Sequence, residues 1–433
     1  MNSTLTKKGR WIMLGQAGLL TACTVTATQY LWQSQVDHNK DKARLLSSAF
    51  DHSGNLYQLF QEGTGDTYDL YLRKVASDGT ESLQPTLLAS GTDPASRFDQ
   101  VTACDNGAVL SGIYNKTIKK LKADGNTEWE HTFDGSSWDV KVTADEDCSL
   151  LVTRERHASG GSTVNFQEVH RLSAQGQQLW SQPLDPLTPA LGSSETTSYL
   201  LDSGATLVLV KNLDQPLSYF VLDAEGTLTT ADTLSDTNTF LIGVTADQIL
   251  VQHGDNTIEG WTPEGSLVWA QTAEANLHTC ADPTPTALLC FGMQPDTYQH
   301  VLTRFDLTDG TNTQVPVNYT GSPGLITNLG GDRWLVEENI LADNGLGRLA
   351  ARPLYQRLHI LDDANLQETT ALTLQPGKSS AQYLEEAGSY IWVQSSPGDY
   401  VQTVQRQGQQ LRVSGWFGYQ HEGTVQAKAY AIK

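Results

Sequence analysis

The sequence is short of positive charge. Its 433 residues include 28 Lys and Arg against 49 Asp and Glu, so the formal net charge is −21 at pH 7. A protein this acidic repels the phosphate backbones of DNA and RNA. Nucleic acids are therefore excluded as general partners.

Long apolar runs are also missing. Apart from the N-terminus, no stretch approaches the roughly 20 residues that a membrane-spanning helix needs. Methionine occurs only 3 times, whereas Thr, Gln, Val and Leu are frequent, a composition that suits strands better than helices. We therefore expect an all-β chain whose only membrane contact lies at the N-terminus.

Signatures of catalysis and cofactor binding are absent from the sequence. There is no G-x-S-x-G, no Walker loop and no EF-hand, and His421-Glu422 does not continue into H-E-x-x-H. Asp145-Glu146-Asp147 could hold calcium, but a solvated acidic turn is the simpler interpretation. We predict no catalytic residue, no metal and no cofactor, and hence a protein that is not an enzyme.

A repeated turn is the main positive feature. Leu121–Trp129 runs from an apolar strand end through Asp124-Gly125, a pair that takes the positive φ values of a tight hairpin, into a second strand that carries a Trp. Related turns recur at Asp78-Gly79, Gln175-Gly176, Glu225-Gly226, Glu264-Gly265, Asp309-Gly310, Asp362–Asn365 and Gln407-Gly408. Their spacing of roughly 40 to 50 residues is typical of four-stranded propeller blades.

A second hairpin alternates with the first along the chain, with turns such as Asp51–Gly54 and Asp202–Gly204. Eight hairpins of each kind predict an eight-bladed β-propeller of four-stranded antiparallel blades over residues 45–433. The blades are expected near 45–92, 97–135, 137–187, 193–236, 238–275, 276–322, 323–377 and 378–433. A pair of β-sandwiches is the alternative, but it would not keep one turn pattern through eight units. Ring closure stays open, because Phe417–Lys433 could complete the last blade or pair with the first.

The N-terminus indicates a secretory signal. Lys7, Lys8 and Arg10 precede the short apolar stretch Trp11–Leu20. Leu20-Thr21-Ala22-Cys23 resembles the lipobox of bacterial lipoproteins. We therefore expect a signal peptide at 1–22 and a lipidated cysteine with a tether at 23–44.

The lipobox resemblance also predicts where in the cell the protein resides. It implies that Cys23 carries acyl chains, and at roughly 0.8 kcal/mol per buried CH₂ two or more chains anchor a protein in effect permanently. Thr24 stands where lipoproteins retained in the inner membrane typically have Asp. The resemblance therefore points to the outer membrane, with the protein facing the periplasm and held by its lipid anchor only.

Four cysteines remain after lipidation. In an oxidising compartment an even number suggests two bridges. Cys280 and Cys290 flank one turn and could face each other across a hairpin. Cys104 and Cys148 lie in the first turns of neighbouring blades and give the second pairing. Metal binding is the rival reading, but there is no C-x₂-C and no His at ligand spacing.

The tryptophans follow the turns at a fixed place, so packing between blades explains them better than stacking on sugars. The units Ala123–Trp129, Ser173–Trp180 and Thr262–Trp269 resemble the PQQ-like propeller repeat. With the lipobox, the whole chain resembles the BamB-like lipoproteins of the β-barrel assembly machinery. That resemblance implies a non-enzymatic protein-binding scaffold whose partners are envelope proteins. The family's Thr-Gly pair is missing from most blades, and no partner-binding residue of the family can be matched.

Two other classes of function remain open. One is a glycan- or peptide-binding propeller, with or without lyase or hydrolase activity. The other is a quinoprotein dehydrogenase, which shares the repeat; this chain resembles those enzymes poorly, because it has no adjacent Cys pair and no evident calcium cluster.

Basic residues in two predicted blades suggest where a partner binds. They are Arg154, Arg156 and His157 in the third blade and Arg348 and Arg352 in the seventh. Blades 3 and 7 are four apart in a ring of eight, so these loops should face each other across it. Opposed positive loops on an acidic body would attract an acidic protein loop or an anionic glycan. The alternative is that they pair with local acids such as Glu155 or Asp343.

Overall fold

The fold is described from a computed structural model of the chain. It describes residues 31–35, 43–63, 68–91, 98–104, 107–112, 115–134, 138–145, 147–157, 164–184, 194–201, 203–212, 216–234, 239–330, 333–343, 349–374, 379–383, 391–395, 400–407, 410–417 and 424–431. All regular elements in these ranges are strands. No helix within them has the length and hydropathy to cross a membrane.

Blades 1 to 4 each contain four consecutive strands. Blade 1 has β2 (Ala43–Phe50), β3 (Leu56–Glu62), β4 (Tyr68–Val75) and β5 (Glu81–Gly91), and blade 2 has β6 (Gln100–Cys104), β7 (Gly107–Ser111), β8 (Thr117–Lys122) and β9 (Thr127–Thr132). Blade 3 has β10 (Trp138–Ala144), β11 (Leu150–His157), β12 (Val164–Leu172) and β13 (Gln178–Pro183), and blade 4 has β14 (Ser194–Leu200), β15 (Thr206–Asn212), β16 (Leu217–Leu222) and β17 (Leu228–Leu234).

Blades 5 to 7 follow the same plan. Blade 5 has β18 (Thr239–Val244), β19 (Ile249–His253), β20 (Thr257–Trp261) and β21 (Leu267–Thr272), and blade 6 has β22 (Asn276–Cys280), β23 (Ala287–Met293), β24 (His300–Asp306) and β25 (Asn312–Pro316). Blade 7 has β26 (Ser322–Asn328), β27 (Arg333–Asp343), β28 (Leu349–Asp362) and β29 (Glu368–Thr373). Each boundary lies close to the one predicted from the turn spacing.

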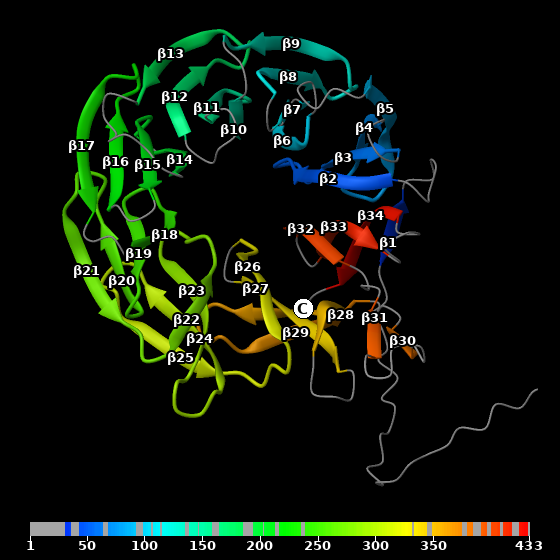
Figure 1. Cartoon of the computed structure of the whole chain (residues 1–433), viewed down its shortest axis with the longest axis vertical. Helices are drawn as coiled ribbons and strands as arrows, with labels where there is room; N and C mark the ends of the chain where they lie inside the picture. The colour runs from blue at the N-terminus through cyan, green and yellow to red at the C-terminus, as the bar shows by residue number, and fades with distance from the viewer. Residues whose placement is uncertain are drawn as a thin grey trace, which may run out of the picture.

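Blade 8 closes the ring with a strand from the other end of the chain. Its order is β1-β34-β33-β32, combining β32 (Tyr400–Gln407), β33 (Gln410–Phe417) and β34 (Thr424–Ala431) with β1 (Trp32–Gln35). Figure 1 shows the eight four-stranded antiparallel sheets arranged radially, with the last blade beside the first. The eight-bladed, all-β prediction is confirmed.

Two predicted boundaries are corrected at this closure. The tether expected at 23–44 ends earlier, because β1 pairs with Gln426–Ala429 and covers the edge of β34. The last blade does not begin at 378, because β30 (Ser379–Tyr383) and β31 (Ile391–Ser395) form a separate two-stranded sheet. Gln407-Gly408 therefore falls between the first two strands of blade 8 rather than the last two.

Glycine makes the repeated outer turns possible. The turn between the third and fourth strands of blades 1 to 6 has a Gly with φ between 75° and 88°, a region that side chains with a Cβ disfavour: Gly79, Gly125, Gly176, Gly226, Gly265 and Gly310. In blade 7, Leu366 takes the left-handed position with φ 55°. The turn chemistry was therefore a sound guide to the blades.

Three tryptophans link neighbouring blades, which confirms the packing interpretation. Trp129 Nε1 donates to Ala174 O of the next blade at 2.9 Å, and Trp180 and Trp269 donate in the same way to Ala224 O and Leu307 O, both at 3.0 Å. A Cβ added to Gly176 would lie 2.6 Å from the Trp129 ring. The absence of a side chain at Gly176 thus leaves room for the Trp129 indole of the neighbouring blade, in addition to permitting the positive φ of the turn.

Two buried arginines hold the closure. Arg73 of blade 1 is fully buried, and its Nη2 donates to Ser34 O of β1 at 3.4 Å. Arg412 of blade 8 donates to Gly54 O in the first turn of blade 1. A hydrogen bond from a charged guanidinium to a carbonyl oxygen is stronger than one between neutral groups. These contacts therefore stabilise the place where the two ends of the chain meet.

Candidate functional site: two polar networks between blades

Both predicted disulfides are present. Cys104–Cys148 joins the first turns of blades 2 and 3, with Cα atoms 5.4 Å apart. Cys280–Cys290 joins β22 to β23 within blade 6, with Cα atoms 4.0 Å apart. One bridge therefore crosses between blades and the other stays inside one blade.

Arg154 was predicted to bind a partner from a basic loop, but the structure shows that it is buried. Its side chain is only 3% exposed and pairs with Glu168 on the next strand. It also donates to Asp134 O at 2.8 Å and lies over the Phe133 ring, 4.2 Å from its centre. Strand alternation turns this residue toward blade 2, so it holds two blades together and does not face solvent.

The other members of the predicted partner site remain predictions. Arg348 lies outside the described residues, and so do the side chains of Arg156, His157 and Arg352. Cys23, the predicted lipidation site, also lies outside the described residues. The backbone places Arg156 and His157 at the end of β11 and Arg352 in β28. The described part of the chain therefore does not test whether these loops face each other.

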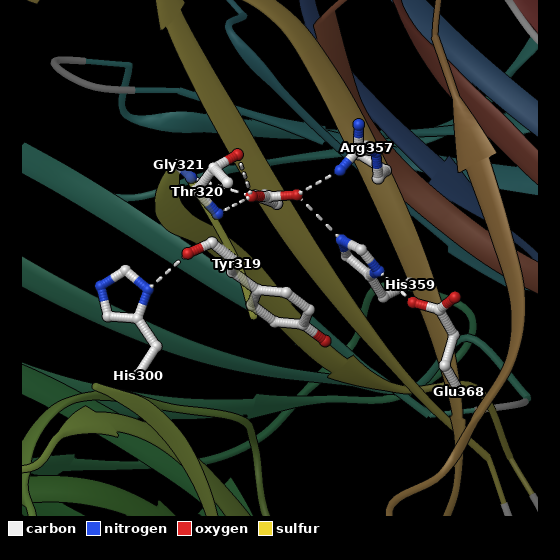
Figure 2. A network of polar contacts seen from close by, with 8 residues as sticks. His300, Tyr319, Thr320, Gly321, Arg357, His359 and Glu368 are labelled. Atoms are coloured by element: carbon white, nitrogen blue, oxygen red, sulfur yellow. Dashed lines mark hydrogen bonds and ion pairs between the residues drawn. The ribbon is translucent and has the colours of Figure 1, made fainter. Parts of the chain in front are cut away.

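A polar network that the sequence analysis did not predict lies between blades 6 and 7 (Figure 2). At its centre is Glu338 of β27, which is 1% exposed. The backbone N–H groups of Thr320 and Gly321 donate to Glu338 Oε1 at 2.5 and 2.8 Å. His359 Nε2 and Arg357 Nη1 lie 3.1 and 3.2 Å from Oε2. Both carboxylate oxygens are therefore held by protein groups.

His359 joins two carboxylates. Its Nδ1 lies 2.5 Å from Glu368 Oε2, while Nε2 faces Glu338. Each ring nitrogen of His359 therefore faces a carboxylate oxygen. Its ring stacks on Tyr319 with centroids 4.2 Å apart, and burial, followed by the charges of Glu368 and Glu338, raises the pKa of the Tyr319 hydroxyl. The Tyr319 carbonyl oxygen in turn lies 3.1 Å from His300 Nδ1.

Two adjacent glutamates of β27 have opposite pKa shifts. Burial alone would raise the pKa of Glu338, but hydrogen bonds from His359, Gly321 and Thr320 outweigh it and lower the pKa to about 2. Glu337 points to the other face of the strand, where burial raises its pKa to about 7 despite hydrogen bonds from Asn339, Leu325 N–H and Gln356. Alternation along one strand thus places a carboxyl group with a lowered pKa and one with a raised pKa on opposite faces.

Blade 3 has the equivalent network with the charges exchanged. Arg154 pairs with Glu168 across β11 and β12, as Glu338 pairs with Arg357 across β27 and β28. His170 corresponds to His359, since each lies two residues after the third-strand member of the pair, Glu168 or Arg357. His170 Nε2 is 2.8 Å from Glu168 Oε1.

A signal for both networks was present in the sequence. V-H-R-L-S at 169–173 and L-H-I-L-D at 358–362 place a His at the same distance before the repeated turn. The acid and the arginine could not be assigned to it, because their pairing depends on the register between strands.

The chemistry of these networks is structural. Hydrogen bonds and ion pairs from neighbouring protein groups hold a buried charge rigidly in place. No group of three or more His, Cys, Asp or Glu that could hold a metal ion was found among the described residues. The networks therefore act as links that fix the relative position of neighbouring blades.

The comparisons with known proteins add little. No protein-family profile matches the chain, and no curated protein sequence is similar to it. Three similar solved structures are the Dos1 propeller (TM-score 0.48, 10% identity, 93% of this chain and 94% of that one), a mitotic checkpoint complex (0.42, 11%, 76% and 95%) and a protein of unknown function from Bacteroides caccae (0.34, 14%, 61% and 92%). With TM-scores below 0.5, the fold assignment depends on the strand order above. A propeller is a fold that supports protein-binding scaffolds in general.

Proposed function

We propose that the protein is a non-enzymatic scaffold that binds other envelope proteins and is anchored by lipidated Cys23 to the outer membrane, facing the periplasm. The proposal includes a role in outer-membrane protein assembly and kinship with PQQ-like propellers. The lipobox at Leu20–Cys23 and Thr24 supports the address.

The main support for the scaffold role is the way in which neighbouring blades are held together. Its buried charges bind neighbouring blades: Arg154 reaches Asp134, Glu338 reaches Thr320 and Gly321, and Arg73 reaches β1. A ring fixed in this way presents loops in constant positions, which lowers the entropy cost of binding a large partner.

Affinity capture tests the scaffold role. The full-length tagged protein is expressed in its bacterial host, and solubilised outer membranes are compared with those of a strain expressing an unrelated tagged lipoprotein. We expect a reproducible set of envelope proteins with this protein alone. Recovery of the same proteins with both would contradict the proposal.

The anchor is tested separately with Cys23→Ala, which should move the protein into the soluble periplasmic fraction and remove the mobility shift of acylation. If the Cys23→Ala variant still fractionated with the outer membrane, the proposed lipid anchor would be wrong, while the scaffold role would be unaffected.

The same preparations separate the alternatives. Binding of anionic glycan fragments by purified protein that captures no envelope protein would favour the glycan-binding class. Uptake of pyrroloquinoline quinone with calcium, seen as cofactor absorbance, would favour the dehydrogenase. For the basic loops, Arg348→Glu with Arg352→Glu and, separately, Arg156→Glu should each lower partner recovery and its salt dependence. Arg154 is left intact because it is buried.

A further inference from the structure

The outer edge of the ring consists of the outermost strand of each blade, and within the described residues each of these strands pairs on one side only. An unpaired strand edge attracts other strands, and proteins usually guard it with charge or proline. The outermost strands of six blades contain such residues: Glu81 and Pro85 in β5, Glu128 and Glu130 in β9, Pro183 in β13, Asp232 in β17, Pro316 in β25 and Glu368 in β29. Figure 1 shows several of these strands on the outside of the ring.

The outermost strand of blade 5 has no such guard. β21, L-V-W-A-Q-T, has neither charge nor proline. Leu267 and Val268 are 49% and 46% exposed, while Trp269 is buried against blade 6. β1 is also uncharged, but it is only four residues long. Among the outermost strands that the structure describes, β21 is thus the best suited to accept another strand.

The surroundings of β21 are acidic. Residues 239–316, which form blades 5 and 6, contain no Lys and one Arg against nine Asp and Glu. That Arg304 is bound to Asp363 by two hydrogen bonds of 2.8 and 2.9 Å. Glu264 before the strand and Glu274 after it are both exposed. An arriving segment therefore meets an apolar edge with negative charge at both ends.

We propose that the β21 edge binds an extended segment of a partner protein by strand addition, and that this segment has apolar residues in its middle and Lys or Arg near its ends. The backbone of β21 supplies the hydrogen bonds, Leu267 and Val268 supply apolar contact, and Glu264 and Glu274 set the charge preference. The proposal rests on the scaffold function and names the kind of partner it takes.

The test uses a synthetic peptide of alternating Val and Thr with Lys at both ends, labelled for fluorescence anisotropy. We expect saturable binding to the intact protein and slower amide hydrogen exchange over 267–272. Val268→Lys should weaken the affinity by roughly tenfold or more. The matched control is Leu179→Lys, because Leu179 precedes Trp180 in β13 as Val268 precedes Trp269 and is 59% exposed. This control should bind as the unchanged protein does.

Two further variants keep the result decisive. Ala270→Lys introduces a guard at a second exposed position of β21 and should weaken binding as Val268→Lys does. A peptide with Pro at its centre should also bind weakly, because it cannot complete the strand pairing. Equal affinity of the β21 variants and the Leu179→Lys control, or unchanged exchange in 267–272, would overturn the proposal.

Affinity capture distinguishes this failure from failure of the scaffold role. If the unchanged protein captures no envelope protein, the scaffold function is wrong. If it captures them and Val268→Lys captures the same set in the same amounts, only the assignment to β21 is wrong.

Discussion

Blades 3 and 7 contain the same three-residue network with the charges exchanged. In blade 3 the central residue is Arg154, paired with Glu168, whereas in blade 7 it is Glu338, near Arg357. A His on the third strand accompanies each pair. The chain segment that enters each blade explains the exchange: Asp134 presents a carbonyl oxygen to Arg154, while Thr320 and Gly321 present N–H groups to Glu338.

The comparison teaches that the backbone of the connecting segment selects the sign of the buried charge. A carbonyl oxygen requires a donor and an N–H group requires an acceptor, since an unpaired buried polar group is costly. The aromatic neighbours agree with this, because the face of Phe133 suits the guanidinium of Arg154. The networks therefore show one architectural position filled in two complementary ways.

The two blades also differ in what surrounds the network. Blade 3 is bound covalently to blade 2 by Cys104–Cys148. Blade 7 instead has Glu337 on the opposite face of β27, where blade 3 has Thr153, 2.5 Å from Ser198 of blade 4. Blade 7 should therefore depend more strongly on pH and blade 3 on redox conditions.

Removal of the central carboxylate should have the largest effect. Glu338→Ala leaves Arg357, His359 and two backbone N–H groups without their acceptor, so we expect a loss of about 3–5 kcal/mol in the free energy of unfolding. Chemical denaturation measures this. The exposed Glu264→Ala serves as control and should change stability little. A loss in Glu338→Ala as small as in the control would show that the network does not hold blades 6 and 7.

Removal of the bridge between blades should have the next largest effect. The Cys104–Cys148 bridge closes a loop of 44 residues, so chain-entropy reasoning predicts that Cys104→Ala with Cys148→Ala loses about 4 kcal/mol of stability. For Cys280→Ala with Cys290→Ala, whose bridge spans ten residues, the expected loss is roughly 3 kcal/mol. Thermal unfolding with and without reductant checks both. If reduction destabilised both variants and the unchanged protein equally, neither bridge would contribute as argued.

Exchange of the charges in blade 3 tests the role of the connecting segment. Arg154→Glu with Glu168→Arg keeps an ion pair but turns a carboxylate toward Asp134 O, so we expect a loss of about 2–3 kcal/mol. Glu338→Arg with Arg357→Glu in blade 7 is the reciprocal exchange and should also destabilise, because it removes the acceptor from Thr320 and Gly321. Stability within the error of the unchanged protein for either exchange would refute this explanation.

The smallest effect concerns pH and Glu337. Its folded pKa of about 7 lies above the ordinary value of 4.5, so the folded state holds the proton more tightly. The contribution of Glu337 to the free energy of unfolding is therefore fully present below pH 4.5 and falls by on the order of 1–3 kcal/mol as the pH rises to 7. Glu337→Gln should remove this decline when unfolding is measured across that window. Glu338 acts oppositely, since its lowered pKa makes stability fall as pH drops from 4.5 toward 2. An unchanged pH profile in Glu337→Gln would contradict the assignment.

The sequence by itself determined the eight-bladed plan and the two disulfides. Turn glycines such as Gly125 act within a few residues, and Cys280 and Cys290 face each other across one hairpin, so a linear pattern contains the information. The tryptophans were predictable for the same reason, because their place after the turn repeats.

Only the tertiary structure decided what depends on contacts between distant segments. The ring closes through β1 and β34, which lie almost 400 residues apart in the chain, and no local pattern marks that pairing. The burial of Arg154 and the Glu338 network depend on strand register and on which backbone group the preceding segment turns inward. A charged residue looks the same in sequence whether it faces solvent or another blade, and the fold decides which because burial requires a partner of opposite polarity at that point.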